Sequence, residues 1–274
     1  MDLFGYRLLC NEHSKFKTMN PLLNISNVSK TYGILKACNA ISFDLYPRQV
    51  LGIVGESGSG KSTLLNCIGS NLEIDTGEIL YKDRNNQTFN IKQLPEPEHR
   101  TLTKTEWGFV QQNPRDGLRM NVTAGANIAE RLLNVGDRHY GKIRDEAKYW
   151  LEKVEINTNR IDDYPHTFSG GMQQRLQLAR VLVTKPRLIF MDEPTGGLDV
   201  SVQAKLLDLL RSLVRNYHLS VILVTHDIGV VRLLADRLLV MKNGQIVESG
   251  LTDRVLDDPQ HPYTQQLVSS VLVN

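Results

Sequence analysis

The chain has 274 residues, of which 23% are charged and 41% hydrophobic, and its formal net charge is +2 at pH 7. That length suits one large domain, or two lobes of one unit, with a substantial hydrophobic core. So small a net charge argues against a nucleic-acid partner, for which a concentrated basic face is expected. No apolar stretch approaches the length that spans a bilayer. We therefore expect no direct membrane insertion, and any membrane role would come through a partner protein.

The N-terminus and the cysteines bear on processing and compartment. Residues 1–20 make a poor signal peptide, with an acid at Asp2, so we expect a disordered tail or a start codon assigned too early. Cys10, Cys38 and Cys67 lack the spacing of metal ligands, and their odd number fits a reducing compartment. These features favour the cytoplasm.

From residue 22 onward, short apolar segments alternate with helical patterns. Strands are predicted at residues 22–28, 41–45, 50–54, 188–191 and 221–224. Hairpins are predicted at 78–91, turning at Asn85-Asn86, and at 238–241 with 245–247, turning at Asn243-Gly244. Helices are predicted at 62–68 and 202–217, a helical pattern covers 124–154, and residues 95–98 are expected to be loop. Alternating buried strands and helices predict an α/β fold with a parallel sheet covered on both faces.

A glycine-rich segment lies between the strand at 50–54 and the helix at 62–68. It reads Gly55-Glu56-Ser57-Gly58-Ser59-Gly60-Lys61-Ser62, with Thr63 following, and fits the phosphate-loop pattern. Glycines let backbone N–H groups turn toward phosphate oxygens, and the helix start adds its dipole. Lys61 would supply charge to the β- and γ-phosphates, and Ser62 a hydroxyl to Mg²⁺. The alternative is a chance match in a Gly/Ser-rich turn, which the flanking strand and helix make improbable.

Two acids and a histidine follow other predicted strands. Asp192 and Glu193 end the strand at 188–191, where Asp192 suits Mg²⁺ held through water and Glu193 suits activation of the attacking water. His226 follows the strand at 221–224, and α/β proteins collect catalytic groups at such strand ends. The alternatives are two acids that simply begin a loop and a structural histidine.

A second predicted helix begins with residues that could bind an anion. Ser169-Gly170-Gly171-Met172-Gln173 opens a helix with Ser169 as a good N-cap, and its glycines allow close approach to the backbone. The alternative is an ordinary capped helix.

Together these segments resemble the ATP-binding-cassette ATPase family, from about Leu22 to the C-terminus and in the family's order. The most specific match is residues 168–175, Phe-Ser-Gly-Gly-Met-Gln-Gln-Arg. The resemblance implies a P-loop NTPase fold with a RecA-like core and parallel sheet, an antiparallel β subdomain and an inserted helical subdomain. It places the nucleotide-binding domain at 21–256, the helical insertion at about 113–180, and a C-terminal turn and helix at 257–274. ATP and Mg²⁺ are the cofactors it implies.

The resemblance also implies roles for single residues. Two subunits would sandwich two ATP molecules head to tail, with Ser169, Gly170, Gly171 and Gln173 of one subunit meeting the γ-phosphate held by Lys61 of the other. Tyr32 would stack on adenine, and Asp199 would lie at the dimer seam, after Gly196-Gly197 where many relatives have serine-alanine. Gln112 would reach Mg²⁺, with Gln111 as the alternative register. The implied catalytic residues are Lys61, Gln112, Glu193 and His226, and the implied metal ligands are Ser62, Gln112 and Asp192.

Within the family, the segments at 113–120, 136–141, 194–211 and 248–272 resemble the cassette subunits of the carbon–phosphorus lyase system, which breaks down phosphonates. The implied partners are the lyase core complex, contacted around residues 115–120, and a second cassette subunit. The alternative is the ATPase of a dipeptide, oligopeptide or nickel importer, which would be membrane-peripheral and which His261-Pro262-Tyr263-Thr264 also resembles. Those four residues have a simpler interpretation as a proline turn before the last helix. A third possibility is a nucleotide-gated scaffold without turnover, against which Lys61, Asp192, Glu193 and His226 speak together.

Overall fold

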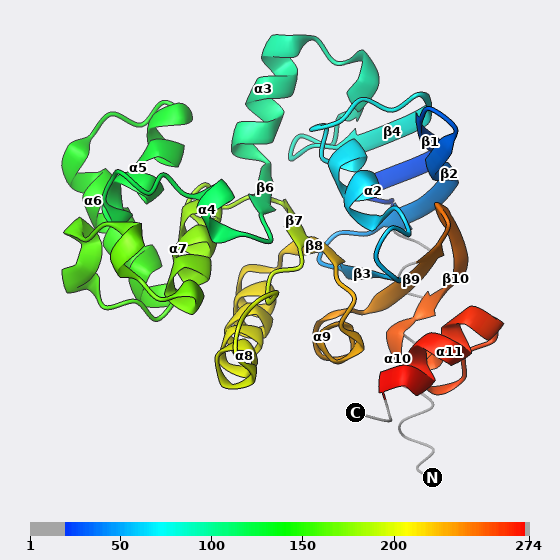
Figure 1. The fold of residues 1–274 in the computed structure, drawn as a ribbon. Coiled ribbons are helices and arrows are strands. Elements are labelled where there is room, and N and C mark those ends of the chain that lie inside the picture. Colours follow the sequence, from blue (N-terminus) through cyan, green and yellow to red (C-terminus); the bar gives the residue numbers. More distant parts are fainter. Residues whose placement is uncertain (1–19, 272–274) are drawn as a thin grey trace, which may run out of the picture.

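The apolar runs of the sequence form a six-stranded sheet through the middle of the molecule (Figure 1). The computed structural model describes residues 20–271, so the tail predicted for residues 1–20 lies outside the described residues apart from Asn20. The strand order is β10-β9-β3-β8-β7-β6, in which β10 alone runs antiparallel to its neighbour. The strands are β3 (Val50–Val54), β6 (Trp107–Val110), β7 (Leu188–Asp192), β8 (Ser220–Val224), β9 (Arg237–Lys242) and β10 (Gln245–Leu251).

The central strands are apolar on both faces because each face borders a different core. In β8, Val221 and Leu223 pack into a core shared with the helices at one face. The alternate residues Ile222 and Val224 pack into a second core, shared with the other sheet. An alternation of polar and apolar residues would leave one of these cores unfilled, which explains the unbroken apolar runs.

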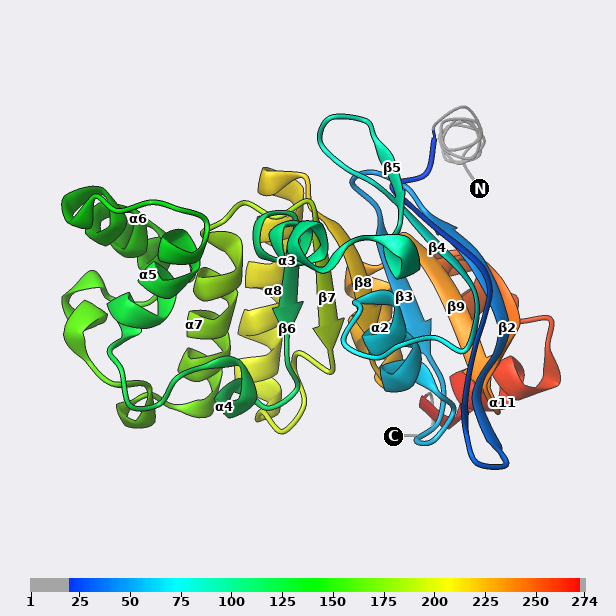
Figure 2. The same cartoon turned by 90° about the horizontal axis from the view of Figure 1, so that it is seen from above.

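A second sheet is antiparallel and has the order β2-β1-β4-β5. Its strands are β1 (Leu23–Tyr32), β2 (Leu35–Leu45), β4 (Thr76–Lys82) and β5 (Thr88–Asn90). Helix α2 (Lys61–Ile68) packs against β1, β2 and β8, so it lies between the two sheets (Figure 2). The rings of Tyr81 and Trp107 meet edge to face across the same interface, with centroids 5.3 Å apart.

A lobe of helices projects from the β6 side of the six-stranded sheet, at the left of both views (Figures 1 and 2). It consists of α4 (Pro114–Gly117), α5 (Ala124–Asn134), α6 (Tyr140–Lys153) and α7 (Gly170–Leu182), with 3-10 turns at Thr158–Asp162 and Pro165–Thr167. The helical pattern predicted for 124–154 is thus two helices, which separate near Gly136, a glycine with a φ of +100°. The parallel core, the antiparallel sheet and the helical lobe confirm the predicted fold class.

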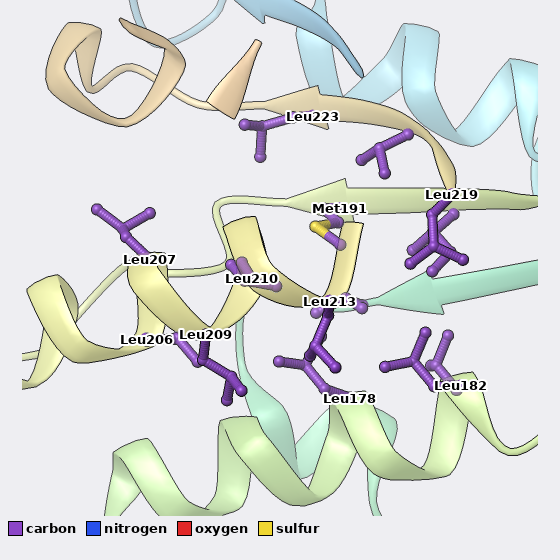
Figure 3. Close-up of a cluster of buried hydrophobic side chains, with 14 of the residues drawn as sticks. Leu178, Leu182, Met191, Leu206, Leu207, Leu209, Leu210, Leu213, Leu219 and Leu223 are labelled. Atoms are coloured by element: carbon purple, nitrogen blue, oxygen red, sulfur yellow. The ribbon is translucent and has the colours of Figure 1, made fainter. Parts of the chain in front are cut away.

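Four helices follow β7 along the described part of the chain. They are α8 (Val200–Tyr217), α9 (Ile228–Leu234), α10 (Thr252–Asp257) and α11 (Pro262–Val271). Leucines of α8 fill the space between α7 and the sheet, where Leu210 and Leu213 meet Leu178, Met191 and Leu223 in one cluster (Figure 3). This packing ties the helical lobe to the strand that carries Asp192.

The loop predicted at residues 95–98 is wrong, because helix α3 (Glu96–Thr105) begins there. Pro97 lies in the first turn, where a missing N–H costs nothing. The negative charges of Glu96 and Glu98 interact favourably with the positive end of the helix dipole. Arg100, one turn farther along the helix, forms an ion pair with Glu96 at 2.7 Å. Among residues 20–271, no helix has the length and apolar character needed to cross a membrane.

Candidate functional site

The glycine-rich loop leaves β3 at Gly55 and enters α2 at Lys61, as predicted. Gly58 and Gly60 have φ values of +80° and +101°, which favour glycine. A methyl group at Gly60 would collide with the Ala37 carbonyl oxygen, and one at Gly55 would collide with the Met241 carbonyl oxygen. The loop therefore needs glycine at these positions to pack against its supporting strands.

The Lys61 ammonium is held inside this loop. It donates hydrogen bonds to the carbonyl oxygens of Gly55, at 2.7 Å, and of Glu56, at 2.9 Å. Burial lowers the pKa of Lys61, while the negative charges of Glu193, Asp192 and Glu56 act in the opposite direction. The positive charge thus lies where the loop would meet the phosphates.

Ser62 and Asp192 come together from different elements. The Ser62 hydroxyl donates to the Asp192 carboxylate at 3.2 Å, which joins the start of α2 to the end of β7. Burial raises the pKa of Asp192, and the hydrogen bond from Ser62 opposes this shift. Two adjacent oxygen ligands, one of them a carboxylate, suit the preference of Mg²⁺.

Glu193 has an uncommon backbone conformation, with a φ of +46°. Its N–H donates to the Val224 carbonyl oxygen at 2.8 Å, which fixes that conformation. The carboxylate points to the end of β8, where it accepts hydrogen bonds from the Thr225 hydroxyl at 3.2 Å and from the His226 backbone N–H at 3.1 Å. The His226 Nδ1 lies 2.8 Å from the same carboxylate, and 71% of the histidine side chain is exposed. The structure therefore pairs the exposed ring of His226 with a mostly buried Glu193 carboxylate.

Thr225 was missed by the sequence analysis, although its position directly after a buried strand was a usable signal. Its side chain is almost fully buried, and its hydroxyl also accepts the Asp227 backbone N–H at 3.1 Å. Thr225 thus holds the carboxylate of Glu193 from a fixed position.

Gln111 and Gln112 differ in their neighbours. The Gln111 carbonyl accepts from the side-chain amides of Gln174 and Gln177, so this residue is tied to α7. A methyl group at Gly196 would lie 3.6 Å from the Gln112 side-chain nitrogen and 3.2 Å from the Glu193 carbonyl oxygen. Gln112 thus neighbours the segment that follows β7, and its predicted contact with Mg²⁺ stays a prediction.

The start of α7, the second helix start that could bind an anion, is exposed to solvent. Ser169 caps α7 by accepting the Met172 N–H at 3.4 Å, and Ser169 and Gly170 face solvent. Gln173 is buried, and its amide donates to the Pro165 and Phe168 carbonyls at 3.0 Å, so it supports the turn before the helix. Its predicted contact with nucleotide stays a prediction.

A cavity of about 380 Å³ opens beside this helix start. Six of its lining residues are Gln112, Phe168, Gly170, Gln173, Gly196 and Leu198. No residue of the glycine-rich loop is among those that line it within the described chain.

The predicted site residues thus form two groups. Lys61, Ser62, Asp192, Glu193 and His226 lie in one connected set. Ser169 and Asp199 are exposed at the starts of α7 and α8, and within residues 20–271 no side-chain hydrogen bond joins them to the loop. One chain therefore presents two separate halves of the predicted site.

Comparison with known proteins identifies the family. The profile described as "ABC transporter" matches residues 38–196, which is more than half of the chain. The phosphonates utilization ATP-binding protein PhnK of Escherichia coli (strain K12) is 64% identical over 93% of this chain and 99% of its own length. The oligopeptide transport ATP-binding protein OppF of Haemophilus influenzae is 39% identical over 86% of this chain and 70% of its own. The dipeptide transport ATP-binding protein DppD of Bacillus subtilis is 36% identical, with coverages of 92% and 77%.

Solved structures agree with this result. The dimeric ATP-binding cassette MJ0796 has a TM-score of 0.75 at 30% identity, covering 84% of this chain and 98% of its own. The cassette cbiO1 of Clostridium perfringens has a TM-score of 0.77 at 25% identity, with coverages of 93% and 96%. The chain belongs to the ATP-binding-cassette family of ABC transporter ATPases and is an ATP hydrolase.

Proposed function

We propose that this chain is the ATPase subunit of a carbon–phosphorus lyase system, in which it uses Mg-ATP hydrolysis to drive a conformational change during phosphonate breakdown. The observation that carries this proposal is the 64% identity to a protein named for phosphonate utilization, over nearly the full length of both chains. The peptide-transport relatives OppF and DppD reach 39% and 36%. The proposed partners are the lyase core and a second cassette subunit, and the proposed compartment is the cytoplasm.

ATP binding is assigned to the glycine-rich loop and Tyr32. The loop's backbone N–H groups and the Lys61 ammonium would hold the β- and γ-phosphates. The Lys61 ammonium is pre-positioned by the Gly55 and Glu56 carbonyls, so it needs only a small movement to reach a phosphate. The exposed Tyr32 ring at the end of β1 is available to stack on adenine.

The residues that would hold Mg²⁺ are Ser62, Asp192 and Gln112. The hydrogen bond between Ser62 and Asp192, and the place of Gln112 beside Glu193, support this assignment. When bound, the metal would offset the negative charge of the phosphate oxygens.

Water activation is assigned to Glu193, with His226 beside it. Phosphoryl transfer depends mainly on positioning and electrostatic stabilisation. The donors at the end of β8 hold the Glu193 carboxylate in one orientation, so it can orient and polarise a water. His226, exposed on the outer side of this pair, is placed to donate toward the γ-phosphate.

The site would be completed by a second subunit arranged head to tail. At the exposed start of α7 the first backbone N–H groups have no carbonyl partner within their own helix, and Ser169 caps that of Met172, so the remaining ones suit a γ-phosphate. The exposed Asp199 begins α8, and the adjacent Val200 side chain is 84% exposed, which favours burial of this corner against another chain.

The importer reading remains the second candidate, because peptide-transport relatives match 86% to 92% of this chain. A growth experiment distinguishes the lyase assignment from the importer alternative. An E. coli K12 strain lacking PhnK and supplied with this chain should grow on a phosphonate as sole phosphorus source, and the Glu193→Gln variant should not restore growth. Failure of the well-expressed parent chain, together with co-purification of a permease, would contradict the lyase assignment.

A further inference from the structure

The segment His261-Pro262-Tyr263-Thr264 reaches the phosphate loop from the far end of the chain. The backbone N–H of Glu56 donates to the Tyr263 hydroxyl at 2.9 Å, although the two residues are 207 positions apart. Tyr263 lies in the first turn of α11, and its side chain is only 3% exposed. Because water has little access to the hydroxyl, this buried contact is specific rather than incidental.

Tyr263 is fixed by contacts on several sides. The Glu248 carboxylate of β10 accepts the backbone N–H groups of Gln260 and His261, at 2.8 and 3.0 Å, which anchors the turn before α11. The His261 Nδ1 accepts the Tyr263 N–H at 3.1 Å. The Lys242 ammonium lies 4.5 Å from the centre of the Tyr263 ring. Burial raises the pKa of the Tyr263 hydroxyl, so it stays uncharged at neutral pH.

The Gly55–Glu56 peptide group connects this tyrosine to Lys61. Its N–H, on Glu56, donates to the Tyr263 hydroxyl, and its carbonyl, on Gly55, accepts the Lys61 ammonium at 2.7 Å. Farther along the loop, the Gly244 N–H of the β9–β10 turn donates to the Ser59 carbonyl at 3.0 Å. The C-terminal part of the chain therefore supports the loop at two points, and only the Tyr263 contact bears on the peptide that holds Lys61.

We propose that Tyr263 is a positioning residue of the phosphate loop: its hydroxyl fixes the Gly55–Glu56 peptide group and so pre-orders the Lys61 ammonium for the triphosphate. This inference rests on the proposed assignment of ATP to that loop. The docking of α11 thereby becomes part of the nucleotide site, and movement of the C-terminal helix is coupled to phosphate affinity. Pre-ordering matters because a loop that must be fixed on binding loses affinity.

The test is the Tyr263→Phe variant, which keeps the ring and removes the hydroxyl. We expect dissociation constants for ATP and for inorganic tripolyphosphate to rise together by about three- to tenfold, the range for one lost hydrogen bond. Hydrogen exchange at the Glu56 amide should accelerate, while amides of α11 keep their protection. The maximal rate at saturating ATP should stay within about twofold of the parent.

Tyr217→Phe is the matched control, since it removes a hydroxyl that bonds only to Tyr149, at 2.9 Å, far along the chain from the loop. Its ring packs against Trp150 of α6 in the helical lobe, so the change should leave both dissociation constants unchanged. If Tyr263→Phe binds both ligands as the parent does while Lys61→Ala loses binding, the inference is overturned and the loop assignment stands. If Lys61→Ala itself binds ATP normally, the loop assignment fails.

Discussion

At the scale of single residues, the site depends on side chains held by groups distant in sequence. Glu193 follows a buried strand, which predicted its position, but its orientation comes from Thr225 and His226, which directly follow the neighbouring strand β8. The phosphate loop could be recognised because its chemistry constrains adjacent residues. Tyr263 could not be recognised as part of the site, because its hydroxyl acts through a tertiary contact that no local pattern records.

Glu193→Gln preserves the shape of the side chain and removes its ability to accept a proton. We expect steady-state phosphate release to fall by about 10²-fold or more, with the dissociation constant for ATP within about threefold of the parent. Glu152→Gln, at an exposed position on α6, is the control and should hydrolyse as the parent does. A Glu193→Gln variant with parental turnover would show that the water is activated elsewhere.

Asp192→Asn should stabilise the nucleotide-free protein while removing Mg-ATP hydrolysis. Burial raises the folded-state pKa of Asp192 above its unfolded value, so deprotonation of this carboxyl as the pH rises lowers the stability of the fold, a cost that a neutral amide does not have. We expect calorimetry without ligand to give a melting temperature about 2 °C higher, and no Mg²⁺-dependent gain when ATP is added. A lower melting temperature at pH 7 would contradict this sign.

At the scale of elements, the sequence predicted the helices with long periodic patterns and the strands that are apolar on both faces. The parallel strands were recognised from their unbroken apolar runs, which the two flanking cores require. The start of helix α3 was predicted to be a loop because Pro95 and Pro97 lie close together there. In a local pattern these prolines outweigh the acids of the first turn, Glu96 and Glu98. Strand β6 was not predicted. It is only four residues long, and Trp107 and its neighbours form a strand by pairing with β7, which the local sequence does not record.

The attachment of the helical lobe to α8 can be tested at Trp150. This side chain is fully buried, and its ring centroid lies 5.0 Å from that of Tyr217. Trp150→Ala should lower the free energy of unfolding by about 3–5 kcal/mol, or the melting temperature by about 10 °C. Tyr140→Ala, in the same helix but 75% exposed, should change it little. Equal losses for the two variants would contradict the burial argument.

At the scale of the whole molecule, one chain carries two half-sites that face solvent separately. The connected set around Lys61 and the exposed Ser169 helix share no side-chain hydrogen bond within residues 20–271. In the proposed function a γ-phosphate held by both would be shared by two chains, and a symmetric head-to-tail pair would form two equal sites. The sequence motifs predicted the residues of each half-site. They did not predict that the two half-sites lie apart within one chain, because that depends on the fold.

The most direct measurement mixes two inactive variants, Lys61→Ala and Ser169→Arg, before Mg-ATP is added. A head-to-tail pair of one copy of each has one site with both defects and one intact site. Random pairing makes half of the pairs mixed, so phosphate release should recover to about a quarter of the parental rate. A mixture as inactive as its components would place the whole ATP site within one chain and contradict the account.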